Sequence, residues 1–237
     1  MTNNLKKSAI ITGASRGIGE AIARKMASCG INLSLVARSQ SALETNARRF
    51  AEEFGVRVLP IPMDVRDENA VIGAVKETLG AFGRIDYLIN NAGYVDPVGI
   101  LEMTSQSWSQ TVDTNLTGVF LFTRETVRYA MKDRGGKIIN IASTAGLSPR
   151  PGWSSYAASK AAVINFSLTM AEELKEYGIK VYCIAPGRTA TELRKILAPE
   201  EDQSAILGPE QIADTVMFLI SDAGDYIDGQ SIIIRKR

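Results

Sequence analysis

The chain has 237 residues, of which 45% are hydrophobic and 22% are charged, and its formal net charge is +1. These totals suit one α/β domain with a large core, and they exclude a general electrostatic attraction to nucleic acid or acidic membranes. No stretch approaches the roughly 18 consecutive apolar residues of a membrane-spanning helix. The N-terminal segment lacks the long apolar region and the cleavage site of a signal peptide, so we expect a cytoplasmic protein.

Composition also restricts the chemistry. The sequence contains no histidine, which excludes histidine-based triads, histidine metal ligands and histidine proton shuttles. Cys29 and Cys183 fall within a predicted helix and a predicted strand, so we expect two buried free thiols and no disulfide. We predict no metal site. Acid–base catalysis must therefore use tyrosine, lysine, aspartate, glutamate or cysteine.

Short apolar stretches alternate with amphipathic ones along the whole chain. Strands are predicted at residues 6–12, 31–37, 56–61, 86–90, 136–143, 179–185 and 230–235. Helices are predicted at residues 20–27, 41–54, 67–82, 105–131, 154–177 and 209–221, and residues 188–207 form a loop with a short helix, a candidate lid. Buried strands that alternate with helices predict one doubly wound parallel sheet with helices on both faces, in a single domain spanning residues 1–237.

A glycine-rich turn joins the first strand to the first helix. Gly13 permits a tight turn, Gly17 lets the backbone approach a pyrophosphate, and Gly19 lets the helix pack closely on the strand. The start of the helix then presents free N–H groups and a positive dipole end to the phosphates. The turn, which also contains Ser15, Arg16 and Ile18, is therefore predicted to bind a dinucleotide.

The end of the second strand indicates which dinucleotide is bound. Many NAD-binding sites place a carboxylate at this position for the ribose 2′-hydroxyl, whereas this chain has Ala37, Arg38 and Ser39. An arginine binds a 2′-phosphate through two hydrogen bonds, and Arg16 is placed to reach the same group. We therefore predict NADP(H) in preference to NAD(H).

Polar and small residues follow the next two strands. Asp64 and Val65 come after the third strand, where a carboxylate meets the adenine edge, and Asn91, Ala92 and Gly93 come after the fourth. In open parallel sheets the ligand crevice lies outside the carboxyl ends of the strands. These residues are predicted to line it.

The second half of the chain supplies the candidate catalytic groups. Asn115 lies within a predicted helix, where its side chain either faces water or points inward, and Ser143 ends the fifth strand. Tyr156 and Lys160 lie one helical turn apart on the same face of the following helix. An ammonium beside a phenol lowers the phenol pKa, so the pair predicts a proton donor that works near neutral pH.

Together these motifs resemble the classical short-chain dehydrogenase/reductase family over essentially the whole length. The residues that carry the resemblance are Thr12, Gly13, Gly17, Gly19, Asn90, Asn91, Ala92, Gly93, Asn115, Ser143, Tyr156, Lys160, Pro186 and Gly187. The resemblance implies a Rossmann-type fold of about seven strands and a homo-oligomer, a tetramer or a dimer. It adds Pro186, Gly187, Thr189 and Thr191 to the cofactor contacts.

The resemblance also implies a mechanism. Ser143 would donate a hydrogen bond to a ketone oxygen, the nicotinamide would deliver hydride to carbon, and Tyr156 would give its proton to oxygen. Lys160 would tune the tyrosine and hold the nicotinamide ribose. Asn115 would hold a water and Lys160 in a proton relay.

The substrate is less clearly indicated. The sequence is similar to the 3-oxoacyl-[acyl-carrier-protein] reductases, which tend to carry two arginines for the acidic carrier protein. Arg128 resembles one of these, but the other position holds Glu172, which would repel an acidic partner. The alternative substrate is a sugar or polyol, which the stretch at residues 186–194 would suit if it carried a phosphate group. The alternative to an enzyme is a non-catalytic regulator that binds a dinucleotide.

Overall fold

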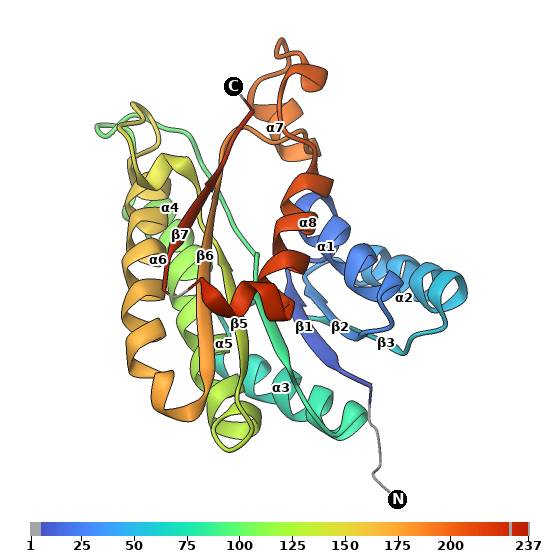
Figure 1. Ribbon diagram of the computed structural model, residues 1–237. Coiled ribbons are helices and arrows are strands. Elements are labelled where there is room, and N and C mark those ends of the chain that lie inside the picture. Colours follow the sequence, from blue (N-terminus) through green and yellow to red (C-terminus); the bar gives the residue numbers. More distant parts are fainter. Residues whose placement is uncertain (1–5, 228, 237) are drawn as a thin grey trace, which may run out of the picture.

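The computed structural model describes residues 6–227 and 229–236 (Figure 1). The predicted absence of a signal peptide concerns residues 1–5 in part, and these lie outside the described residues, as does Arg237. The strands are β1 (Ser8–Thr12), β2 (Asn32–Ala37), β3 (Val58–Pro62), β4 (Tyr87–Asn90), β5 (Gly136–Ile141), β6 (Ile179–Pro186) and β7 (Ser231–Ile234). They form one seven-stranded sheet in the order β3-β2-β1-β4-β5-β6-β7, and every neighbouring pair is parallel.

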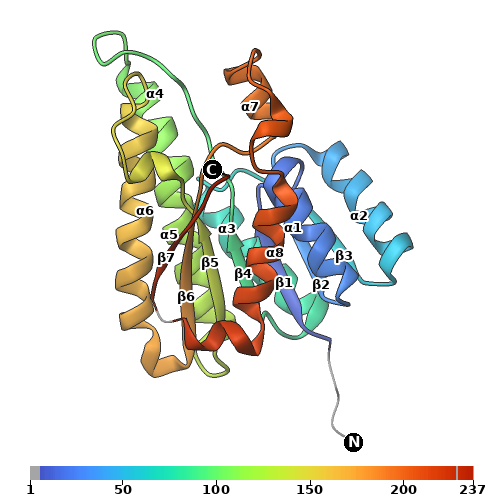
Figure 2. The same cartoon turned by 45° about the horizontal axis from the view of Figure 1, so that its top comes forward.

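Helices cover both faces of this sheet. They are α1 (Gly17–Ser28), α2 (Gln40–Phe54), α3 (Glu68–Phe82), α4 (Ser105–Val112), α5 (Gly118–Thr126), α6 (Ser154–Glu173), α7 (Glu192–Leu197) and α8 (Pro209–Ile220). In Figures 1 and 2, α1, α2 and α8 lie on one face, while α3, α4, α5 and α6 lie on the other. The predicted doubly wound α/β fold is confirmed.

Alternating residues of each strand build the two cores. Ile11 of β1 packs with Met26 of α1 and Val216 of α8 on one face of the sheet. Its neighbour Ile10 packs with Phe122 of α5 on the other face. Because successive strand residues point to opposite faces, strands that are apolar throughout require a helical layer on both sides.

The predicted helix at residues 105–131 is interrupted twice. A π-helical segment, Asp113–Thr117, separates α4 from α5, and a second, Val127–Met131, follows α5. The first segment contains Asn115, whose side chain is fully buried. A π-helical turn contains an extra residue, so it changes which side chains face inward and is frequent at functional sites.

The prediction for one of the two cysteines is wrong. Helix α1 ends at Ser28, so Cys29 lies beyond the helix, at its C-cap, and is exposed. Cys183 lies in β6 and is buried, as expected. No helix in the described part of the chain is long and apolar enough to cross a membrane.

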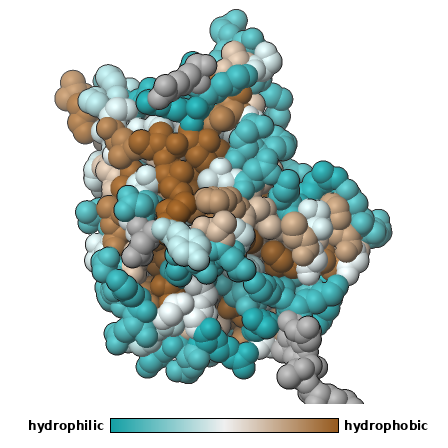
Figure 3. Space-filling model, in the orientation of Figure 1, coloured by the Kyte–Doolittle hydropathy of each residue, from teal (hydrophilic) through white to brown (hydrophobic). Residues whose placement is uncertain are grey.

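The edge strand β7 leaves part of its apolar surface uncovered. Ile233 is 51% exposed, whereas most residues of the other strands are buried. Figure 3 shows an apolar area over this strand on the face that Figure 1 presents to the viewer. Apolar side chains gathered on one face are typical of surfaces that bind another protein chain.

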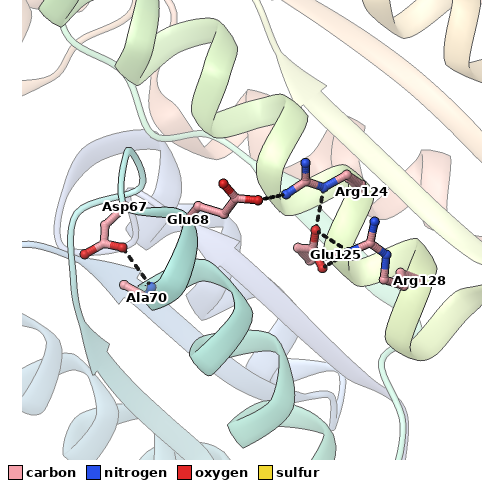
Figure 4. A network of polar contacts seen from close by, with 6 residues as sticks. All are labelled: Asp67, Glu68, Ala70, Arg124, Glu125 and Arg128. Atoms are coloured by element: carbon pink, nitrogen blue, oxygen red, sulfur yellow. Dashed lines mark hydrogen bonds and ion pairs between the residues drawn. The ribbon is translucent and has the colours of Figure 1, made fainter.

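A buried carboxylate joins α5 to its neighbours (Figure 4). The side chain of Glu125 is fully buried and accepts hydrogen bonds from the guanidinium groups of Arg124 and Arg128, the latter at 3.2 Å. Arg124 also pairs with Glu68 at the start of α3. The network therefore fixes α5 against α3, and it occupies the guanidinium of Arg128.

We predict that Glu125→Gln lowers the free energy of unfolding by about 2 kcal/mol, because it removes the buried charge that both guanidinium groups share. Urea unfolding measures this change. Glu68→Gln is the matched control, and it costs less than about 1 kcal/mol because its carboxylate is mostly exposed. Equal losses in the two variants would contradict a structural role for the buried charge.

Candidate active site

A cavity of about 950 Å³ lies at the carboxyl ends of the strands, and residues of α7 contribute to its wall. Figure 2 shows α7 beyond this edge of the sheet. The cavity is lined by all the predicted cofactor contacts except Gly19 and by the predicted catalytic residues except Asn115. The predicted residues in its wall are Gly13, Ser15, Arg16, Gly17, Ile18, Arg38, Ser39, Asp64, Val65, Asn91, Ala92, Gly93, Ser143, Tyr156, Lys160, Pro186, Gly187, Thr189 and Thr191.

The glycine turn forms one wall and requires its glycines. Gly13 and Gly17 have φ angles of 67° and 62°, which favour residues without a Cβ atom. A Cβ on Gly19 would lie 2.3 Å from the Gly13 carbonyl oxygen, so no other residue fits there. Gly19 therefore acts through packing, which explains its absence from the cavity wall.

Two side chains hold this turn in place. The Asn91 side-chain amide donates to the carbonyl oxygens of Thr12 at 3.0 Å and Gly13 at 3.2 Å, which ties the end of β4 to the turn. On the other side, the buried Asn46 of α2 donates to the carbonyl oxygens of Ala14 and Ser15. Sequence reasoning missed Asn46, since nothing in the helix pattern distinguishes it from a solvent-facing asparagine.

Two guanidinium groups face the cavity beside the turn. Neither Arg16 nor Arg38 forms a hydrogen bond or ion pair with any residue that the structure describes. Asp64 is engaged by Arg66, whose guanidinium donates to both carboxylate oxygens, and this pairing lowers the pKa of Asp64. The predicted contact of Asp64 with an adenine would therefore compete with Arg66, whereas Arg16 and Arg38 are available to bind an anion.

Ser143 and Tyr156 meet at the centre of the cavity. Ser143 lies just beyond β5 and caps a short 3₁₀ turn, Thr144–Gly146, by accepting from the Ala145 N–H at 3.1 Å. This turn packs against α6 because Gly146 lacks a side chain; a Cβ there would lie 2.6 Å from the Ala161 nitrogen. The turn thereby places Ser143 within hydrogen-bond reach of Tyr156.

The expected lowering of the Tyr156 pKa is wrong for this structure. Burial raises the pKa of Tyr156, and the hydrogen bond with Ser143 lowers it only in part. The Lys160 ammonium donates to the Ile141 carbonyl oxygen at 2.8 Å and lies 5.8 Å from the Tyr156 ring centroid. Burial also lowers the pKa of Lys160 to about 8. For both groups, loss of contact with water therefore shifts the pKa more than the attraction between the ammonium and the phenol does.

Asn115 points inward, which settles the alternative that its sequence position left open. Its side-chain oxygen accepts from the Tyr94 N–H at 2.7 Å, and its amide donates to the Tyr94 carbonyl and the Ser159 hydroxyl. A Cβ on Gly93 would lie 3.6 Å from the Asn115 side-chain oxygen and 3.8 Å from the Lys160 nitrogen. Asn115 thus fixes the loop after β4 close to Lys160, and its relay role remains a prediction.

Several cavity residues were missed by sequence reasoning. Tyr94, Arg150 and Trp153 line the wall near Tyr156, and Leu193 and Arg194 of α7 line the mouth. Trp153 and Arg150 precede Tyr156 closely in the chain, so their proximity to the tyrosine was an available signal. No group of three or more metal-ligating side chains occurs in the described part of the chain.

Comparison with known proteins gives a consistent result. A family model of the short chain dehydrogenases matches residues 7–202. A 3-oxoacyl-[acyl-carrier-protein] reductase of Synechocystis is 37% identical over 238 residues, covering 98% of this chain and 96% of the relative. A relative with the same name from Chlamydia muridarum is 34% identical and covers 97% of this chain.

Solved structures agree with these relatives. L-Sorbose reductase from Gluconobacter frateurii, complexed with NADPH and L-sorbose, superposes with a TM-score of 0.90 and 32% identity, covering 97% of this chain and 95% of the other. A variant of actinorhodin polyketide ketoreductase with NADPH gives a TM-score of 0.92 and 28% identity, covering 99% and 97%.

The lowered pKa of Lys160 predicts a pH-dependent stability. Because the folded pKa is about 8 and the ordinary value is 10.5, the unfolded state binds the extra proton between these values. Stability therefore rises with pH in that window. We expect the free energy of unfolding of the wild type to gain about 2 kcal/mol over Lys160→Met between about pH 8 and about pH 10.

Urea unfolding at a series of pH values measures this gain. Lys132→Met removes an exposed amine and controls for the general effect of losing one positive charge. A constant difference between wild type and Lys160→Met across the window would show that burial does not alter the lysine.

Proposed function

This chain belongs to the short-chain dehydrogenase family of oxidoreductases, and we propose that it reduces a ketone to an alcohol with NADPH, with Tyr156 as proton donor. The observation that carries the proposal is the convergence of Ser143, Tyr156 and Lys160 on one cavity with the glycine turn. Hydroxyl groups held beside a dinucleotide cradle can bind a carbonyl oxygen while a hydride reaches its carbon.

The residues present fit NADPH. The glycine turn lines the cavity, and its backbone meets the start of α1, where free N–H groups favour a pyrophosphate. Arg16 and Arg38 present unpaired guanidinium groups for the 2′-phosphate. Similarity to NADPH-bound reductases supports the same cofactor.

Ser143, Tyr156 and Lys160 have different roles in the proposed reaction. The hydride for the carbonyl carbon is supplied by NADPH when it is bound. Ser143 donates a hydrogen bond to the carbonyl oxygen and stabilises its developing negative charge. Tyr156 transfers its phenolic proton to that oxygen, so the products are the alcohol, NADP⁺ and a tyrosinate. The ammonium of Lys160 stabilises the tyrosinate until water returns the proton.

For the substrate, the named relatives support a 3-oxoacyl thioester. Docking of an acidic carrier protein is less well supported, because Glu125 occupies the guanidinium of Arg128 and Glu172 carries the opposite charge. The second candidate is a sugar or polyol, and similarity to an enzyme complexed with L-sorbose supports it.

The proposal includes a homo-oligomer, a dimer or a tetramer, working in the cytoplasm. Large apolar side chains stay exposed on three neighbouring helices: Trp108 of α4, Phe120 of α5 and Leu168 of α6. The uncovered face of β7 in Figure 3 is a second surface of this kind. Contact between copies of the chain would remove both from water.

We predict that Tyr156→Phe lowers kcat for ketone reduction by about 10²- to 10⁴-fold, because the ring loses its transferable proton. NADPH affinity is retained, since the ring itself remains. NADPH oxidation with a panel of ketones measures the first effect, and fluorescence titration measures the second. Tyr177→Phe, beyond the far end of α6, is the control.

Two results would overturn this assignment. Full turnover by Tyr156→Phe would exclude the tyrosine as the proton donor. NADPH binding by the wild type without turnover of any ketone would favour the dinucleotide-binding regulator.

We also predict that Arg38→Ala weakens NADPH binding by about 10- to 100-fold, the value of a charge-assisted hydrogen bond, and changes NADH binding little. The reason is that only NADPH carries the 2′-phosphate. Arg48→Ala, an exposed arginine of α2 outside the cavity, is the control. Equal losses for both cofactors would exclude Arg38 as the phosphate ligand.

A further inference from the structure

One end of the cavity remains after the glycine turn and the cofactor arginines are accounted for. There the Trp153 ring packs edge-on against the Tyr156 ring, with 5.7 Å between ring centroids and 78° between planes. The Trp153 N–H donates to the Arg150 carbonyl oxygen at 3.0 Å. Tyr156, Trp153 and Arg150 all line the cavity; the first two are in ring contact, and the last two are joined through the backbone.

The backbone of this wall is anchored. The Gly152 carbonyl oxygen accepts from the Val98 N–H at 2.9 Å, which joins the loop before α6 to the loop after β4. The second loop is itself fixed by Asn115 through Tyr94. Arg150 thus belongs to an anchored loop that lines the cavity.

The other arginines at this end are already neutralised. Glu201 accepts from Arg194 at 2.5 Å and from Arg188 at 2.8 Å. Pairing with Arg194 and then with Arg188 lowers the pKa of Glu201 to about 2, so its charge persists at working pH. The stretch at residues 186–194 that suggested an anion site in the sequence therefore has little free positive charge.

Arg150 differs from these two arginines. Its side chain lines the cavity, and its guanidinium forms no hydrogen bond or ion pair with any residue in the ranges 6–227 and 229–236. The two carboxylates in the cavity wall are both engaged elsewhere, Asp64 with Arg66 and Glu192 with Lys195 at 2.8 Å. The Arg150 guanidinium therefore belongs to the same cavity as Tyr156, and neither carboxylate of the cavity wall pairs with it.

We propose that Arg150 binds an anionic group on the substrate, so that this enzyme prefers small ketones carrying a phosphate or a carboxylate close to the carbonyl. The inference rests on the proposed ketone reduction and names its substrate class. A guanidinium binds either anion through two parallel hydrogen bonds, which orients the ketone as well as holding it. Trp153 supplies an apolar surface between this anchor and the reacting carbonyl.

Matched pairs of ketones test the charge directly. Dihydroxyacetone phosphate is compared with dihydroxyacetone, and acetoacetate with methyl acetoacetate, in NADPH oxidation assays. We expect the wild type to prefer the charged member of at least one pair, and Arg150→Gln to lose about tenfold or more in kcat/KM on it, mainly through KM. The loss on the neutral member is much smaller, and Arg150→Lys recovers part of the preference.

Arg134→Gln is the control. Arg134 is exposed in the turn before β5, at the opposite edge of the sheet from the cavity, and forms no ion pair with a described residue. Thermal unfolding checks that Arg150→Gln is folded. A preference in the phosphate pair identifies phosphate as the anchored group, and a preference in the carboxylate pair identifies carboxylate.

A binding measurement separates this inference from the proposed reaction. Calorimetric titration of the NADPH-loaded protein with glycerol 3-phosphate or 3-hydroxybutyrate needs no turnover. Binding that Arg150→Gln loses and Tyr156→Phe keeps supports the anion site even if no ketone is reduced, whereas missing turnover alone counts against the proposed function. Equal behaviour of Arg150→Gln and Arg134→Gln, or no preference for charge in either pair, overturns the inference.

Discussion

The candidate site depends on a buried ammonium. Lys160 is almost fully buried, and its one hydrogen bond within the described chain goes to the Ile141 carbonyl at the end of β5. Removing a charge from water is costly, which is why its pKa falls to about 8. The turn after β5 packs closely on this part of α6 because Gly146 has no side chain; a Cβ there would lie 2.7 Å from the Lys160 carbonyl carbon. Sheet, turn and helix α6 are thus positioned around one charge.

Much of this arrangement follows from sequence, for a geometric reason. Strands that are apolar throughout must be covered on both faces, and parallel strands deliver their following loops to a single edge. Residues as distant in sequence as Gly13, Asn91, Ser143 and Pro186 therefore reach one cavity. Their positions in the sequence predict this, since each lies at the end of a strand or within two residues after it.

Spacing does not determine what the side chains do once they meet. Tyr156 and Lys160 share a helical face as expected, yet burial raises the pKa of the tyrosine. Asn115 faces inward because a π-helical segment shifts the helix there. Cys29 is exposed because it lies at the C-cap, beyond the end of α1 at Ser28. Each outcome depends on competing contacts that a linear pattern does not contain.

The arginines show most clearly that sequence position does not determine the contacts that a side chain makes in the fold. In sequence Arg128, Arg150, Arg188 and Arg194 are equivalent cations. In the fold Glu125 occupies the first and Glu201 the last two, so only Arg150 keeps its charge available. A paired guanidinium attracts a ligand weakly because the ligand must compete with a carboxylate already in place. Recognition of a charged substrate or partner is therefore set by which arginines lack an acidic neighbour, and the motifs that carry the family resemblance do not determine that choice.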